Sequence, residues 1–253
     1  MTIASTTEQP TAWLTAQPFA HRGLYDAAAG IPENSVAAFE KAIDAGYGIE
    51  LDVQLTADGD AIVFHDSTLE RLTGKKGSVR LYGSARLQQM KLKDSDQTIP
   101  SLSSVLFDVA PGHPLLIEAK SPPGDPLPLC FAIRRALEGY KGPVAVMSFN
   151  PVIVRWFAEN APRIMRGLVV TDGPQKLPWW ARFKFARRYV QWRAKPQFLA
   201  YDIQHLPSEM SVEYRRRGIP VLTWTVRTDE DRARAAEHAD NIIFEPQPPA
   251  TTP

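Results

Sequence analysis

The sequence predicts a (β/α)8 TIM barrel with a hairpin and a short insertion after the second strand. Short apolar, β-branched segments recur along the 253 residues, and most of them are separated by stretches with helical character. This alternation is typical of a parallel sheet covered by helices. Eight of the segments can serve as barrel strands, and the chain has the usual length of such a barrel, about 250 residues. No Gly-x-Gly-x-x-Gly turn follows an early strand, which disfavours the open doubly wound sheet of dinucleotide-binding proteins.

The eight barrel strands can be placed from these apolar segments. They are expected over residues 19–22, 48–54, 114–120, 144–149, 165–170, 198–203, 220–226 and 241–245. Helices are expected over residues 35–46, 126–139, 151–160, 177–193, 208–217 and 228–238. Asn34 or Ser35 can cap the first helix, and Gly46 can end it.

A ninth apolar segment, "AIVFHD", follows "IELDVQL" after only the five residues "TADGD". That connection is too short for a crossover helix, and Asp-Gly is a hairpin-turn signature. We therefore expect a hairpin beyond the second barrel strand, whose return arm brings His65 back toward the end of that strand. Residues 67–100 then form an insertion before the third barrel strand.

One domain over residues 19–246 is expected, with a flexible leader at 1–18 and a disordered Pro/Thr tail at 247–253. The leader has neither the basic start nor the apolar stretch of a secretory signal. No later segment approaches the roughly 18 uninterrupted apolar residues of a membrane-spanning helix. These features predict a soluble, cytoplasmic protein.

Composition excludes several classes of function. The formal net charge is +1, and no tail carries a run of like charge, so general nucleic-acid binding is not expected. Cys130 is the single cysteine, which rules out an internal disulfide and a cysteine-based zinc site. It fits a reducing compartment and is expected to be a small core residue.

Charged side chains recur where the predicted strands end, and in a TIM barrel these ends converge on one mouth where catalysis occurs. They are His21 and Arg22, Glu50 and Asp52, His65 and Asp66, and Glu118 and Lys120. Residues two apart along a strand share a face, so Glu50 and Asp52 are expected to point the same way. The same spacing relates Glu118 to Lys120.

Three inward carboxylates would repel one another without a cation among them. Glu50, Asp52 and Glu118 offer hard oxygen ligands, which suit Mg2+ or Ca2+. The alternative is that they form ordinary ion pairs with Arg22 and Lys120.

Two histidines at the same barrel end suggest proton transfer. His21 and His65 can act as general acid and base, whereas Arg22 and Lys120 can contact a phosphate oxygen. The remaining histidines are expected to be structural: His113, His205 and His238.

Several motifs together resemble the glycerophosphodiester phosphodiesterase family. They are "HRG", "PENS", "ELDV", "DG", "FHD", L-x-R-L-T, "IEAK", "SFN" and "WTV", and the resemblance extends from Phe19 to Pro246. It implies a barrel with an insertion after the second strand and hydrolysis of glycerophosphodiesters to sn-glycerol 3-phosphate and an alcohol.

The resemblance also implies roles for individual residues. A divalent cation would be held by Glu50, Asp52 and Glu118, and the acid/base pair would be His21 and His65. Arg22 and Lys120 would contact phosphate, and we expect Trp224 of "WTV" to contact substrate.

Two features differ from the family pattern. The segment "IIFEP" has Phe244 and Glu245 where the family often has Thr and Asp, and no role is carried onto Glu245. The insertion is short for bacterial members that use it to enclose glycerol. Three alternatives therefore stay open: lysophospholipase D type cleavage of lysolipids, formation of a cyclic phosphate, and a non-catalytic barrel that binds phosphodiesters.

Residues 176–195 combine basic and aromatic side chains and contain no acidic residue. Part of such a helix can pack on the barrel, but its rings are too many for one narrow buried stripe. Rings flanked by basic side chains resemble interfacial amphipathic helices. We expect this segment to contact lipid-like substrate or, transiently, a membrane surface, with packing on the barrel as the alternative.

Overall fold

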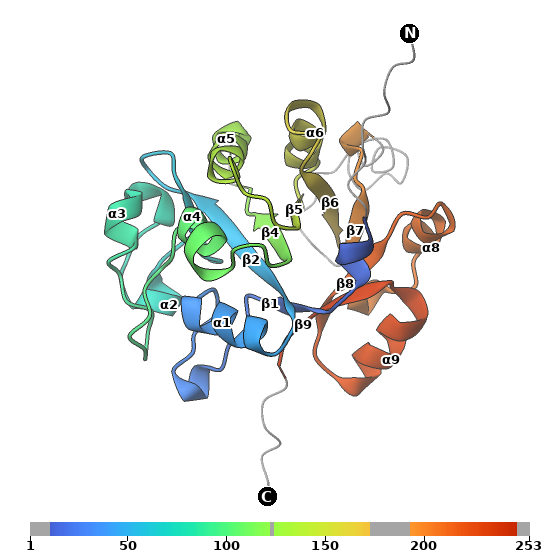
Figure 1. Ribbon diagram of the computed structural model, residues 1–253, viewed down its shortest axis with the longest axis horizontal. Helices are drawn as coiled ribbons and strands as arrows, with labels where there is room; N and C mark the ends of the chain where they lie inside the picture. Colours follow the sequence, from blue (N-terminus) through green and yellow to red (C-terminus); the bar gives the residue numbers. More distant parts are fainter. Residues whose placement is uncertain (1–10, 122–123, 173–192, 247–253) are drawn as a thin grey trace, which may run out of the picture.

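A computed structural model describes residues 11–121, 124–172 and 193–246 of the chain. Eight parallel strands form a closed barrel, because β1 pairs with both β2 and β9. The strands are β1 (Phe19–His21), β2 (Gly48–Leu55), β4 (Leu115–Ala119), β5 (Val144–Ser148), β6 (Met165–Val170), β7 (Phe198–Asp202), β8 (Val221–Val226) and β9 (Asn241–Phe244). Helices surround these strands (Figure 1). The predicted TIM barrel is confirmed.

The predicted hairpin is present as well. Strand β3 (Ala61–Val63) runs antiparallel to the end of β2, with Val53 opposite Val63. The turn between them closes through hydrogen bonds between Thr56 and Asp60, and Gly59 adopts a φ of 80°. The hairpin returns the chain to the carboxyl end of β2.

Five of the described helices on the outside of the barrel match ranges expected from the sequence, whereas the short helix at Leu102–Ser104 was not expected. These helices are α1 (Val36–Asp44), α4 (Leu102–Ser104), α5 (Leu127–Ala136), α6 (Pro151–Asn160), α8 (Glu209–Arg216) and α9 (Asp229–His238). Ser35 caps α1, since its side chain accepts a hydrogen bond from the backbone N–H of Ala38, and Gly46 follows the helix in the left-handed region. The helix expected over residues 177–193 falls almost entirely outside the described residues.

The insertion at 67–100 contains three short helical turns, α2 (Glu70–Thr73), η3 (Val79–Leu81) and α3 (Ser84–Leu87). Together with β3 it buries a small apolar cluster of its own: Ile62, Phe64, Leu69, Val79, Leu87, Met90, Leu92 and Ile99. A separate cluster fills the barrel interior, and a larger one lies between the barrel wall and the helices. The insertion is therefore anchored by its own apolar packing beside the barrel end to which β3 returns.

Residues 11–18, which we expected to belong to a flexible leader, instead close the amino-terminal end of the barrel. The 3-10 helix η1 (Thr11–Thr15) lies in front of the strands in Figure 1, and Leu14 is completely buried in the barrel interior. The side-chain amide of Asn241 donates hydrogen bonds to the carbonyls of Leu14 and Gln17, both at 2.8 Å. The sequence did not predict this packing, because the two apolar residues Trp13 and Leu14 are too few to form a periodic pattern. Residues 1–10 and the tail at 247–253 lie outside the described part of the chain.

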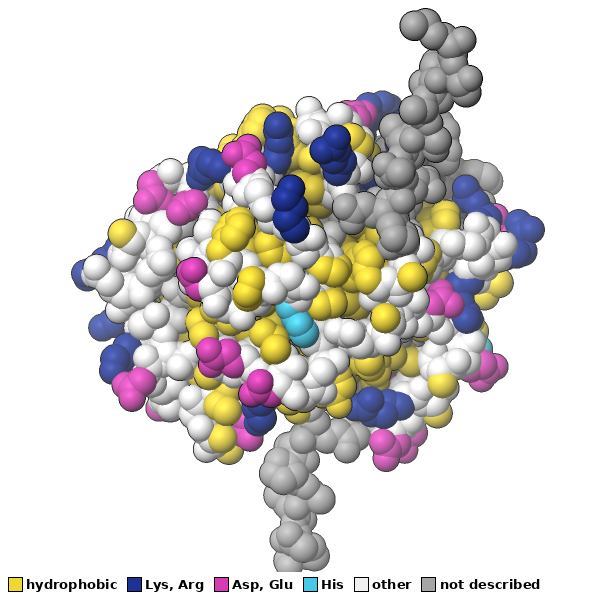
Figure 2. Space-filling model, viewed as in Figure 1, with side chains coloured by type: hydrophobic (Ala, Val, Ile, Leu, Met, Phe, Trp, Pro, Cys, Tyr) yellow, Lys and Arg dark blue, Asp and Glu magenta, His cyan; other side chains and the backbone are white. Residues whose placement is uncertain are grey.

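Charge on the visible face is of mixed sign. Acidic and basic side chains are interspersed around its rim, and hydrophobic atoms lie mainly toward its centre (Figure 2). This distribution agrees with the near-neutral total charge.

Candidate active site

Three buried carboxylates meet at the carboxyl ends of β2 and β4. The strand register explains the meeting, because Asp52 lies opposite Glu118 in the β2–β4 pair, and Glu50 precedes Asp52 by two residues. One oxygen of each of the three side chains lies within 4.8 Å of the others. Glu50 is 1 % exposed, Asp52 0 % and Glu118 7 %. The predicted ligand set is thus brought together.

This cluster has the properties of a divalent cation site. Oxygen Oε1 of Glu50 is buried and has no hydrogen-bond partner among the described residues. Burial raises the pKa of Glu50 well above its usual value, and the neighbouring carboxylates of Asp52 and Glu118 raise it further. Ionising all three acids is therefore unfavourable without added positive charge. A hard cation with oxygen ligands would supply that charge, so these residues fit Mg2+ or Ca2+.

Two basic side chains already partly neutralise the carboxylates. The ammonium of Lys120 lies 2.8 Å from Oδ1 of Asp52 and 2.7 Å from Oε1 of Glu118. Nε of Arg22 lies 3.1 Å from Oδ2 of Asp52. Burial alone would raise the pKa of Asp52, but Lys120 and Arg22 lower it below its usual value. The ion pairs weighed as an alternative are therefore real, and they coexist with the unpartnered Glu50 oxygen.

The loop after β1 holds Arg22 in an unusual backbone conformation. Arg22 has a φ of 60° and Gly23 a φ of 78°, and a Cβ on Gly23 would lie 2.8 Å from the carbonyl of Ala38 in α1. Only glycine fits this close approach of loop and helix. The "HRG" motif thus has a steric reason, and it directs Arg22 over the carboxylates.

Asn34 is a site residue that the sequence reasoning placed only as a candidate helix cap. Its side-chain amide donates a hydrogen bond of 2.9 Å to Oδ2 of Asp52 and accepts one of 3.2 Å from the Asp52 backbone N–H. It is 2 % exposed and has a φ of 57°, a left-handed conformation that asparagine tolerates better than most residues. Asn34 therefore holds Asp52 in place, in addition to the ion pairs that Asp52 forms with Lys120 and Arg22.

His21 lies between Glu50 and a carboxylate from the last barrel strand. The backbone pairs His21 with Glu50, and the His21 Nε2 atom lies 3.8 Å from Oε2 of Glu50. On the other side of the ring, Nδ1 lies 2.8 Å from Oε1 of Glu245. Glu245 also binds Arg227, through contacts of 2.6 and 2.9 Å. The structure thus gives Glu245 a partner at the site, which the sequence did not reveal.

His65 has a comparable arrangement at the end of the hairpin. Its Nδ1 atom lies 2.7 Å from Oδ1 of Asp66. Arg71, from the insertion, binds both oxygens of Asp66 and both oxygens of Glu33. Hydrogen bonds from Arg71 and His65 lower the pKa of Asp66 to about 2.

Trp224 lies on β8 and packs against the barrel interior. Its indole N–H donates a hydrogen bond of 2.8 Å to the carbonyl of Ala200, and its ring meets Phe149 edge to face with centroids 5.4 Å apart. Its polar group is therefore occupied within the protein. Any contact with substrate would use the ring surface alone.

Cys130, His113 and His205, which we expected to be structural, are buried or bound within the protein. Cys130 is fully buried, and burial raises the pKa of its thiol to about 12. Nε2 of His113 lies 2.6 Å from the carbonyl of Tyr47, and Nδ1 of His205 lies 3.2 Å from Asp202.

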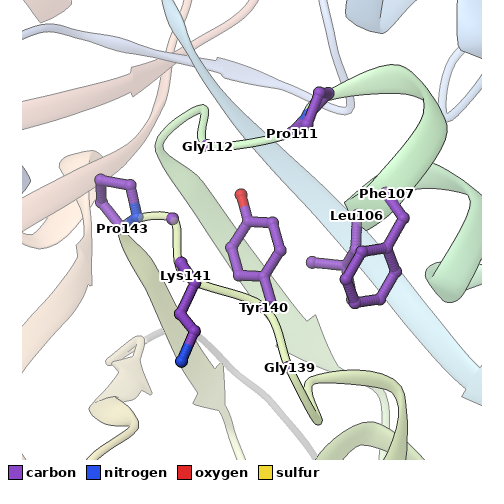
Figure 3. A pocket seen from close by; sticks show the side chains of 9 residues that line it. Leu106, Phe107, Pro111, Gly112, Gly139, Tyr140, Lys141 and Pro143 are labelled. Carbon is purple, nitrogen blue, oxygen red and sulfur yellow. The ribbon is translucent and has the colours of Figure 1, made fainter.

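A cavity of about 330 Å3 lies at the opposite end of the barrel (Figure 3). Its walls come from the π-helix η4 (Val105–Val109), which contributes Phe107, and from the loops that precede β4 and β5, which contribute Tyr140 and Lys141. Tyr140 directs its hydroxyl to the carbonyls of Ala110 and His113, so the wall is mainly apolar. It holds none of the candidate site residues.

In the part of the chain that the structure describes, no helix is both long and apolar enough to cross a membrane.

Comparisons with known proteins agree on one family. The model of the glycerophosphoryl diester phosphodiesterase family matches residues 21–243. A glycerophosphodiester phosphodiesterase of Caldanaerobacter subterraneus subsp. tengcongensis is 31% identical over 238 residues, which cover 88% of this chain and 91% of the relative.

Solved structures show the same fold. A phosphodiesterase of Oleispira antarctica, solved in complex with the product sn-glycerol-3-phosphate, has a TM-score of 0.73 at 23% identity and covers 92% of this chain and 94% of its own. A glycerophosphodiester phosphodiesterase of Thermotoga maritima has a TM-score of 0.70 at 25% identity, covering 89% of this chain and 92% of its own.

Proposed function

This chain belongs to the glycerophosphoryl diester phosphodiesterase family, and we propose that it hydrolyses glycerophosphodiesters to sn-glycerol 3-phosphate and an alcohol. Membership makes the protein a phosphoric diester hydrolase. The observation that carries the finer proposal is the cluster at the mouth, where three buried carboxylates, two basic side chains and a histidine meet, with a second histidine nearby. The product of the Oleispira antarctica relative supports the choice of glycerol 3-phosphate.

Glu50, Asp52 and Glu118 would hold a divalent cation, Mg2+ or Ca2+. When bound, the ion supplies positive charge that stabilises the phosphate oxygens as charge develops on them. Arg22 and Lys120 add donors beside the same carboxylates and would bind the non-bridging oxygens of the phosphodiester. They orient the phosphate for attack from one side.

His21 and His65 would move the two protons of the reaction. One imidazole takes a proton from the attacking water as the new oxygen–phosphorus bond forms, and the other gives a proton to the alcohol oxygen as the old bond breaks. Their two rings approach the cluster from different elements, β1 and the end of the hairpin.

The products distinguish this reaction from its alternatives. Glycerophosphocholine and lysophosphatidylcholine are incubated with the protein and followed by phosphorus NMR. We expect glycerol 3-phosphate and choline from glycerophosphocholine. Lysophosphatidic acid formed faster than glycerol 3-phosphate would favour the lysophospholipase D reading, and a cyclic phosphate would show attack by an internal hydroxyl. Lack of turnover of both substrates would leave a non-catalytic binding barrel.

We further propose that residues 176–195 contact the lipid-like part of the substrate or, transiently, an anionic membrane surface. The support is their composition, because basic side chains near an anionic bilayer contribute about 1 kcal/mol each. Co-sedimentation with anionic and neutral vesicles at low and high salt tests the membrane version. Wild type should sediment with anionic vesicles at low salt and an Arg187→Glu/Arg188→Glu variant should not. Negligible sedimentation of both proteins in every condition would contradict it. The cytoplasmic location stays a prediction.

A further inference from the structure

We propose that Glu245 and Asp66 are positioning residues, each held by an arginine, which fix the orientation of His21 and His65. Each carboxylate contacts the Nδ1 atom of one histidine, and both of its oxygens accept hydrogen bonds from one guanidinium. The arginines are Arg227 for Glu245 and Arg71 for Asp66. The inference rests on the proposed function, in which the two imidazoles transfer protons.

The Glu245 arrangement is built from the last two barrel strands. Glu245 follows β9 directly, and its backbone N–H donates to the carbonyl of Val226 at the end of β8. Arg227 directly follows Val226 in the chain. Its Nε atom lies 2.6 Å from one oxygen of Glu245, and its Nη2 atom lies 2.9 Å from the other. Burial alone would raise the pKa of Glu245, but hydrogen bonds from His21 and Arg227 lower it to about 2. The group beside His21 is therefore a fixed anion.

The Asp66 arrangement uses the insertion. Arg71, in α2, places Nε 2.6 Å and Nη2 2.8 Å from the two oxygens of Asp66. The same guanidinium binds Glu33, which in turn accepts a hydrogen bond from Arg22. The insertion thus contributes a residue that reaches the mouth, a role separate from enclosing the substrate.

The geometry has a consequence for the imidazole tautomer. A carboxylate at Nδ1 favours a proton on that nitrogen, which leaves the lone pair on Nε2. For His21, Nε2 is the atom that faces the carboxylate cluster, 3.8 Å from Glu50. A neighbouring anion also stabilises the imidazolium that forms when Nε2 takes a proton. Glu245 therefore prepares Nε2 of His21, and Asp66, which lies at Nδ1 of His65, favours the same tautomer in that ring.

The test combines kinetics with NMR on the full-length protein in Mg2+. Glu245→Gln keeps the shape of the side chain but removes its charge. Arg227→Lys keeps the positive charge but cannot donate the two parallel hydrogen bonds to the oxygens of Glu245. We expect kcat for glycerophosphocholine to fall by about 10- to 100-fold in each, with KM within about twofold. Asp66→Asn tests the second histidine in the same way. Arg155→Lys is the matched control, since Arg155 binds Glu159 on the outer surface of α6 and should keep wild-type kinetics.

Long-range 1H–15N spectra of 15N-histidine-labelled protein give a readout that a purely structural role would not move. Wild-type His21 should carry its proton on Nδ1, and Glu245→Gln should populate the Nε2–H form. An unchanged His21 spectrum in Glu245→Gln would overturn the inference, whatever happens to kcat. The inference would also fail if His21→Ala were inactive but Glu245→Gln kept the wild-type kcat despite an altered His21 spectrum.

A fully active His21→Ala variant would instead contradict the proposed function, while the tautomer measurement would still decide whether Glu245 orients the ring.

Discussion

Replacing Asn34 should destabilise the protein and weaken its hold on a divalent cation, because this side chain fixes Asp52. Its two hydrogen bonds to Asp52 are buried, and one of them goes to a charged oxygen. Leaving a buried donor or a charged acceptor without its partner costs about 1–3 kcal/mol. The lost bonds to Asp52 should together lower the free energy of unfolding by about 2–4 kcal/mol.

Two variants separate the side chain from the backbone. Both lose the hydrogen bonds, but Asn34→Gly accepts the φ of 57° freely, whereas Asn34→Ala keeps a Cβ in the left-handed region, which costs about 1 kcal/mol relative to glycine. Urea unfolding with and without Mg2+ measures both effects. Asn34→Ala should be less stable than Asn34→Gly, and both should gain less from Mg2+ than wild type gains.

The reasoning would be refuted if Asn34→Gly unfolded within about 0.5 kcal/mol of wild type, the usual range of a surface substitution, and bound Mg2+ as tightly.

Three other outcomes follow from the same geometry. His21→Ala and His65→Ala should each lower kcat about a hundredfold or more while circular dichroism stays unchanged, and near wild-type turnover in either would remove that histidine from the mechanism. Glu50→Gln should weaken Mg2+ binding measured by calorimetry yet stabilise the chelator-treated protein, because it removes a buried carboxyl group whose pKa is raised by desolvation and by the carboxylates of Asp52 and Glu118; equal Mg2+ affinity would count against the ligand set. Asp66 and Glu245 have their pKa lowered to about 2, so the stability that these carboxylates contribute is complete above about pH 4.5 and is lost as the pH falls toward about 2. In urea unfolding, Glu245→Gln should therefore lose less stability than wild type over this pH range. An identical pH dependence would contradict the lowered pKa of Glu245.

The strands and the carboxylates could be predicted because both depend on short-range periodicity. Alternating side-chain directions place Glu50 and Asp52 on one face, and the parallel register then sets Glu118 opposite Asp52. The hairpin was equally visible, since the five residues between the two apolar segments are too few for a crossover helix and contain the turn signature Asp58-Gly59.

The side-chain contacts around His21 and His65 could not be predicted from the sequence. Glu245 and His21 are separated by 224 positions, and their contact depends on closure of the barrel between β1 and β9. Arg71 reaches the mouth only because the insertion packs on β3 through its own apolar cluster. Asn34 was weighed as a cap, but Ser35 takes that role and leaves the asparagine free to bind Asp52.

Metal dependence of product release tests the central claim most directly. The protein is stripped with a chelator and assayed for glycerol 3-phosphate released from glycerophosphocholine, before and after titration with Mg2+ or Ca2+. We expect negligible release from the stripped protein and recovery with at least one of the two cations, with Glu50→Gln requiring much more of it. Full activity of the chelator-treated protein would contradict the account, because the cluster of Glu50, Asp52 and Glu118 would then serve the reaction without a cation.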